Sequence, residues 1–170
     1  MAITKHFRFN LVIVLLALSS SLFAQTSTNS QLNNFWREAE RQVTEGDFEA
    51  YSKSFHPEAI LVNGMNNTSI PIQRALDGWK AGFLDTRAGK MKASVRFRFS
   101  DQSVGDSAAH FTGIFRYEWQ NSGEESQIVF IHLEALLTRS RGQWQMLMEY
   151  QKALANEDEW GSLLPLLDKD

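Results

Sequence analysis

The segment between Glu45 and Asn63 limits the possible folds of this chain more than any other. It carries, in order, the signals of a helix end, a tight turn, a second short helix and a strand. Gly46 suits the left-handed backbone conformation that closes a helix. Asp47 can cap the next helix, because its carboxylate accepts hydrogen bonds from backbone N–H groups that lack partners in the first turn. The segment therefore predicts two helices joined by a turn and followed by a strand.

The second helix is predicted to be short and apolar on one side. Three aromatic residues recur within it at three- and four-residue spacing, namely Phe48, Tyr51 and Phe55. His56 precedes Pro57, and proline disfavours a helical conformation of the residue before it. We therefore expect the helix to end there and a short strand to cover residues 59–62.

The first 24 residues have the three parts of a secretory signal peptide. Lys5 and Arg8 give a positive start, residues 11–18 form an apolar run, and residues 19–24 are typical of a cleavage region. The alternative, an uncleaved membrane anchor, would need an apolar run of about 20 residues. We expect cleavage after Ala24, a secreted or periplasmic location, and no membrane association of the mature chain.

The composition of the mature chain excludes several classes of function. It keeps 15 of the 17 basic residues and all 20 acidic residues, a net charge of 15 − 20 = −5, with no basic cluster. Nucleic acid is therefore not an expected partner, because phosphate binding needs grouped lysine and arginine. The chain contains no cysteine. Its hydrophobic core, rather than disulfides, must hold it together, and thiolate metal sites and iron–sulfur clusters are excluded.

Hydrophobic periodicity divides the rest of the chain into helices and then strands. Residues 25–30 are polar and are expected to form a disordered leader. Apolar residues recur with helical period over residues 31–45 and again, after Pro71, over residues 75–83. The pattern then becomes alternating, which predicts half-buried strands over residues 95–99, 108–120, 127–139 and 144–152.

This order of elements predicts one α+β domain over residues 31–152. Helices followed by a meander of long strands are expected to pack on one face of the sheet. The tail, residues 153–170, is acidic at first and then rich in leucine. It is expected to form either a short capping helix or a contact with a partner subunit.

Two motifs in this pattern resemble the nuclear transport factor 2-like superfamily. The first is the opening segment from Glu45 to Asn63. The second is the closing hairpin from Glu134 to Tyr150, in which a turn with glycine precedes Trp144. The chain is most similar to the SnoaL-like proteins and a neighbouring branch of domains of unknown function, related in fold to ketosteroid isomerase. The resemblance implies a cone-shaped fold in which three N-terminal helices pack on a strongly curved antiparallel sheet and enclose a pocket.

The resemblance does not imply that this chain has ketosteroid isomerase activity. That enzyme uses an aspartate base, a tyrosine and a protonated aspartic acid. The family pattern places Asn63 at the position of the base, and an amide cannot accept a proton at neutral pH. It places Ala39, which has no hydroxyl, near the position of the tyrosine. Glu134 falls at the position of the protonated aspartic acid, so only this third position keeps an acid. Because this superfold hosts enzymes, binding proteins and assembly domains, the activity must be argued from the site.

His132 and Glu134 are the candidate catalytic residues. Alternation places them on the same face of one strand, about 7 Å apart at the backbone. If that face lines the pocket, the histidine is a base and the carboxylate orients it or acts as an acid. In the alternative, Ile131 and Leu133 face the core and this pair lies outside, because both faces of the strand are apolar.

The candidate ligand-binding residues are largely aromatic. Tyr150 and Met148 share a face of the last strand that the resemblance turns toward the pocket, which leaves Glu149 pointing away. The other candidates are Tyr51, Trp79 and Asn63. A metal site made of His110, His132 and Glu134 would need a favourable register of neighbouring strands and is not expected. No phosphate loop, nucleophile elbow or dinucleotide motif is present, so no cofactor is expected.

These features together favour an exported domain that binds a small, apolar or partly polar organic ligand. If it is an enzyme, the pocket is typical of cofactor-free acid–base chemistry such as isomerisation, cyclisation or dehydration. The alternative is a non-catalytic module for dimerisation or interaction, since long strands with two apolar faces suit burial against a partner. A homodimer is expected in either case.

Overall fold

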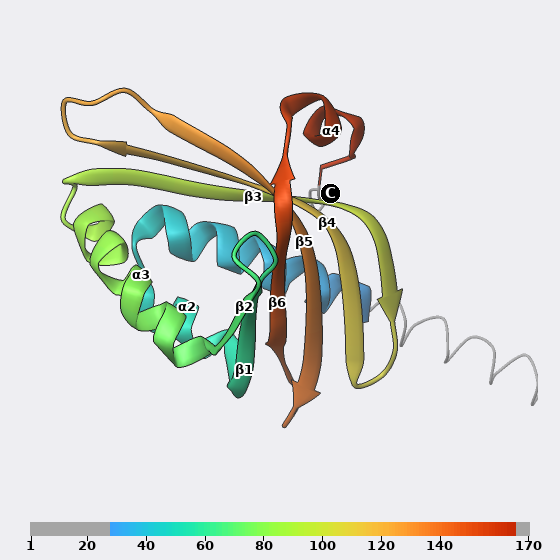
Figure 1. Cartoon of the computed structure of the whole chain (residues 1–170). Helices are drawn as coiled ribbons and strands as arrows, with labels where there is room; N and C mark the ends of the chain where they lie inside the picture. Colours follow the sequence, from blue (N-terminus) through green and yellow to red (C-terminus); the bar gives the residue numbers. More distant parts are fainter. Residues whose placement is uncertain (1–27, 166–170) are drawn as a thin grey trace, which may run out of the picture.

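The computed structural model describes residues 28–165 (Figure 1). Residues 28–45 are helical, so this helix already includes residues 28–30, which the sequence places in the disordered leader. The elements that follow are, in order, α2 (Phe48–Lys53), β1 (Phe55–Asn63), β2 (Thr68–Pro71), α3 (Ile72–Arg87), β3 (Met91–Val104), β4 (Ala108–Asn121), β5 (Gln127–Ser140), β6 (Gln143–Ala155) and α4 (Glu157–Ser162). The predicted signal peptide, residues 1–24, lies outside the described residues.

The six strands form one curved, open sheet in the order β2-β1-β6-β5-β4-β3. The strands from β3 to β6 form an antiparallel meander, as alternation predicts. β1 lies parallel to β6, so the expectation of a purely antiparallel sheet is wrong. No tight hairpin joins these two strands, and a long connection leaves both orientations open. The sheet bends around the helices without closing, and the domain is α+β (Figure 1).

The opening turn forms as its residues predict. Gly46 has a φ of +68°, the left-handed conformation that glycine adopts most readily. Asp47 is the N-cap of α2, and its Oδ1 accepts a hydrogen bond of 3.2 Å from the backbone N–H of Ala50. The local signals therefore determine this turn.

The end of α2 differs from the prediction. Phe55 is not part of the helix, which ends at Lys53; it begins β1 instead and pairs with Met146 of β6. Its buried ring gains more from the sheet than from another helical turn, so tertiary packing overrides the helical spacing. The predicted strand over residues 59–62 lies within the longer β1.

The hydrophobic core lies between the helices and the concave face of the sheet. Trp36, on the helix over residues 28–45, is 0% exposed. Its ring centroid lies 4.8 Å from those of Phe97 and Phe99 and 5.2 Å from that of Phe111. These aromatic contacts fix the first helix against β3 and β4.

The C-terminal tail contains α4, which lies on the opposite, outer face of the sheet. The guanidinium of Arg98 donates hydrogen bonds to the backbone oxygens of Trp160 (2.9 Å) and Leu163 (3.1 Å). The Trp160 ring packs on Phe130, with centroids 5.9 Å apart. The tail therefore covers part of the outer face and leaves the concave face to the other helices.

Candidate functional site

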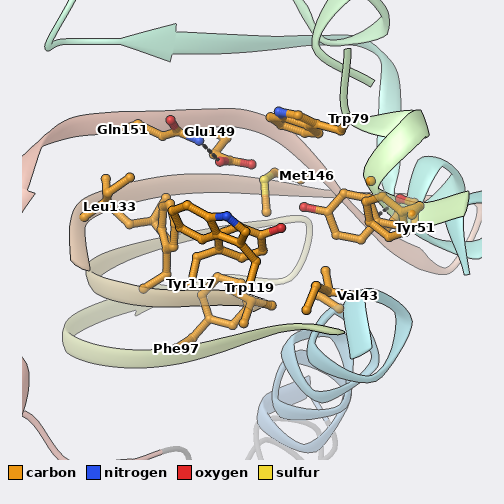
Figure 2. Close-up of a pocket in the computed structure, with 18 of the residues that line it drawn as sticks. Val43, Tyr51, Trp79, Phe97, Tyr117, Trp119, Leu133, Met146, Glu149 and Gln151 are labelled. Carbon is orange, nitrogen blue, oxygen red and sulfur yellow. Dashed lines mark hydrogen bonds between the residues drawn. The ribbon is translucent and has the colours of Figure 1, made fainter. Parts of the chain in front are cut away.

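A cavity of about 460 Å³ lies between the concave face of the sheet and the helices (Figure 2). Its walls come from the helix over residues 28–45, from α2 and α3, and from the strands β3 to β6. Most lining side chains are aromatic or aliphatic, among them Tyr51, Trp79, Tyr117 and Trp119. This volume and composition are typical of sites for small organic molecules.

The polar groups of the cavity centre on Glu149. The side-chain amide of Gln151 donates a hydrogen bond of 2.7 Å to its Oε1 (Figure 2). Glu149 is 7% exposed, and burial raises the pKa of its carboxyl, which the Gln151 hydrogen bond lowers to a smaller extent. Burial also raises the pKa of Tyr51 well above its ordinary value, and the nearby Glu149 and Tyr117 raise it further. The tyrosines are thus neutral hydrogen-bonding groups, whereas Glu149 can change its charge.

An irregularity in β6 turns Glu149 toward the cavity. Met146 pairs with Leu137 and Met148 with Leu136, so Leu147 is an extra residue in β6. One extra residue reverses the alternation of every side chain that follows it. Met146 and Glu149 therefore both line the cavity, although strict alternation predicts that Glu149 points away.

Comparison with known proteins finds solved structures with the same fold as this chain. No protein-family model matches the chain, and no curated protein matches it. The chain resembles an NTF2-like protein with a cystatin-like fold from Novosphingobium aromaticivorans, with a TM-score of 0.61 and 13% identity over 80% of this chain and 87% of that one. It also resembles the beta subunit of benzoate 1,2-dioxygenase from Burkholderia mallei, with a TM-score of 0.60 and 10% identity over 76% of this chain and 91% of that one. A third similar structure is a putative calcium/calmodulin-dependent kinase II association domain from Exiguobacterium sibiricum, with a TM-score of 0.55 and 15% identity over 84% of this chain and 95% of that one.

The chain has an NTF2-like fold, as the similar structures show. The structures named above include an enzyme subunit and an association domain. At such low identity, the likeness shows the fold of this chain and leaves its activity to be argued from its own residues.

His132 and Glu134 do not line the cavity, so the alternative that places this pair outside is the correct one, and a catalytic role for the pair in the cavity is wrong. Their neighbours Ile131 and Leu133 line it instead. On the outer face, His132 Nε2 lies 3.3 Å from the carboxylate of Glu159, and Glu134 bonds Lys152. The outer face also carries buried apolar residues: Ile114, which pairs with His132, is only 3% exposed, and α4 lies on this face.

The remaining predicted ligand-binding residues divide into two groups. Tyr51 and Trp79 lie in the cavity lining, and their role in binding stays a prediction. Tyr150 and Met148 do not line it, because the extra residue in β6 turns them to the other face. Asn63 also lies elsewhere: its Oδ1 accepts a hydrogen bond of 3.0 Å from the backbone N–H of Asn66, which stabilises a turn.

The described residues show neither a metal site nor a membrane-spanning helix. Within residues 28–165, no group of three histidine, aspartate or glutamate side chains is arranged to hold a metal ion. In the same part of the chain, no helix is long and apolar enough to cross a bilayer. Sequence reasoning missed Glu149 and Gln151, because nothing in the local pattern marks the extra residue in β6.

Glu149→Gln is expected to stabilise the protein at pH 8 by about 1–3 kcal/mol, the cost of desolvating a buried polar group without full compensation. A carboxyl whose pKa is raised on folding contributes stability that is fully present below its unfolded pKa and is lost as the pH rises through its folded pKa. The difference between variant and wild type should therefore vanish near pH 4. Urea unfolding at both pH values measures it.

Glu134→Gln is the matched control. Lys152 lowers the pKa of the Glu134 carboxyl, so its ionised form favours folding and the same substitution should give no gain at pH 8. Equal destabilisation by Glu149→Gln at pH 4 and pH 8 would contradict the assignment of Glu149 as the buried acid.

Proposed function

We propose that this domain is exported and binds a small, predominantly apolar organic molecule in the cavity between sheet and helices. The observation that carries the proposal is an aromatic cavity of about 460 Å³ with one acidic group in its wall, Glu149. Export is supported by the signal-peptide pattern of residues 1–24. Apolar burial would supply most of the binding free energy, and the few polar groups would orient the ligand.

The burial of the Glu149 carboxyl favours a role in ligand binding over a purely structural role. A buried carboxyl opposes folding unless it is well paired, and the described contacts give it one amide partner, Gln151. Its replacement by a neutral group is expected to stabilise the protein, as argued above. Residues that oppose stability in a cavity are typical of functional sites.

Cofactor-free acid–base catalysis is the enzymatic form of this proposal. Glu149 would transfer the proton, since it is the only carboxyl or imidazole that lines the cavity within residues 28–165. Tyr51 and Tyr117 would donate hydrogen bonds to an oxygen that gains charge during the reaction. Proton transfer by His132, the base predicted from sequence, is not part of this proposal, because His132 lies on the other face of the sheet.

Gly78→Phe is expected to abolish ligand binding. Gly78 lies on α3 in the cavity lining, and a Cβ placed there meets no atom within 4 Å, so the helix accepts a side chain at this position and a phenyl ring there is expected to occupy space in the cavity. Native mass spectrometry of exported, undenatured protein should show extra mass on the wild type and none on the variant. Affinity for a neutral naphthalene fluorophore should fall at least tenfold.

Arg74→Phe is the control for this experiment. It adds the same ring to an exposed position of the same helix and should leave both readouts unchanged. A wild-type protein that carries no ligand and gives no saturable fluorescence change would overturn the proposed function.

Association is the second candidate function, and the outer face of the sheet favours it. Ile60 on β1, Met148 on β6 and Leu136 on β5 are neighbours in the register, and together they form an apolar stripe. One of the solved structures with this fold is named as an association domain. The predicted homodimer would bury this stripe. The same native mass spectra report it: a ligand-free dimer would favour association over binding.

A further inference from the structure

Glu149 is a buried acid that faces a cavity without a basic partner. Other carboxylates that lie against the sheet have cations: Glu134 bonds Lys152, Glu118 bonds Arg116, and Glu40 bonds Arg96. The hydrogen bond that Glu149 accepts comes from the neutral amide of Gln151 and goes to Oε1. Within residues 28–165, no lysine, arginine or histidine lines the cavity.

This arrangement determines which ligand charges the cavity accepts. A carboxylate removed from water needs an opposite charge beside it, otherwise it takes up a proton. An anionic ligand would add a second negative charge in the same apolar space. A cationic ligand would supply the missing partner and allow Glu149 to ionise without leaving its site.

The aromatic side chains around Glu149 also suit a cation. In Figure 2 the side chains of Tyr51, Trp79 and Trp119 surround the space that the Glu149 carboxyl faces. Tyr117 and Trp119 stack with their centroids 5.4 Å apart and an interplanar angle of 22°, and together they form one aromatic wall. The faces of aromatic rings attract ammonium groups, most strongly where water is excluded.

We propose that the ligand of this cavity is an organic amine, which binds as its ammonium ion beside the Glu149 carboxylate with its hydrocarbon part against the aromatic walls. The inference rests on the proposed function, because it names the chemical class of the molecule that the cavity holds. Gln151 is a positioning residue: its amide occupies Oε1 and leaves Oε2 to the ammonium. The other titratable groups facing Glu149 are Tyr51 on α2 and Tyr117 on β4, which burial keeps neutral.

Two naphthalene probes of the same shape test the inference. 2-Naphthylmethylamine carries the ammonium, and 2-naphthylmethanol carries a neutral hydroxyl. In calorimetric titrations of the mature protein at pH 7, the amine should bind at least tenfold more tightly than the alcohol. Glu149→Gln should reduce the affinity for the amine at least tenfold and so remove the preference for the amine over the alcohol. Equal affinities for the two probes in the wild type, or an unchanged preference in the variant, would overturn the inference.

Proton release gives a second readout that needs no variant. At a pH where free Glu149 is protonated, binding of the ammonium requires the carboxylate, so up to one proton per ligand should leave for the buffer. Titrations in two buffers of different ionisation enthalpy measure this release, which should decrease as the pH rises and be absent for the alcohol. Absence of release with the amine at every pH from 4 to 7 would overturn the inference.

The outcomes separate the inference from the proposed function. If the alcohol binds as well as the amine, and Gly78→Phe blocks both, the cavity binds apolar molecules but does not select amines. If neither probe binds, the proposed function fails and the inference fails with it. Tighter binding of 2-naphthoate than of the amine would show that the cavity selects the opposite charge and would overturn the inference alone.

Discussion

Trp36→Ala is expected to lower the free energy of unfolding by about 3–5 kcal/mol, a large share of the total stability of a domain of this size. Trp36 is fully buried and touches three phenylalanine rings of β3 and β4. Its removal leaves a void that these rings can only partly fill, because they are held by the sheet. Urea unfolding followed by circular dichroism measures the loss. Since Phe97 also lines the cavity, ligand affinity should fall as well.

Two further variants define the cause of this loss. Trp36→Phe keeps an aromatic ring and removes an indole N–H that has no described hydrogen-bond partner, so it should cost much less than Trp36→Ala. Leu84→Ala, at a position on α3 that is 50% exposed, should change stability by less than about 1 kcal/mol. A Trp36→Ala variant as stable as Leu84→Ala would contradict the assignment of Trp36 to the centre of the core.

Gly113→Val is expected to destabilise the fold by at least about 3 kcal/mol, and the protein is expected to accumulate poorly in soluble form. An ideal Cβ at Gly113 would lie 2.1 Å from the backbone oxygen of Arg98 and 2.9 Å from the Cα of Phe99. Neither backbone atom can move away without separating β3 from β4. Soluble yield and the thermal unfolding midpoint measure the effect.

The cause of this close contact is the curvature of the sheet. The register of β3 and β4 shifts between Phe99 and Asp101, so an extra residue in β3 bends the strand against Gly113. Thr112→Val is the matched control, because it places the same side chain at the preceding position of β4, on the opposite face. It should leave stability within about 1 kcal/mol of wild type. Similar unfolding midpoints for Gly113→Val and wild type would show that the strands tolerate separation here.

The sequence by itself determined the features that depend on neighbouring residues along the chain. Gly46 and Asp47 close one helix and cap the next, as their backbone preferences require. Alternation located the four long strands, because a half-buried strand needs one apolar and one polar face. Helices before a meander of strands indicate an α+β domain, and the resemblance of two motifs to a known superfamily implies a pocket between helices and sheet.

Only the tertiary structure decided which side chains face that cavity. The extra residue Leu147 is seen only in the pairing of β6 with β5, and it turns Glu149 inward and Tyr150 outward. For His132 and Glu134 the sequence leaves both faces of β5 open, because both carry apolar residues, and the structure places the pair on the outer face, beside α4. The conformation of a turn is set by residues next to each other, whereas partners far away in sequence set which face of a strand points to the cavity. The sequence therefore determined the elements, and the strand register determined the site.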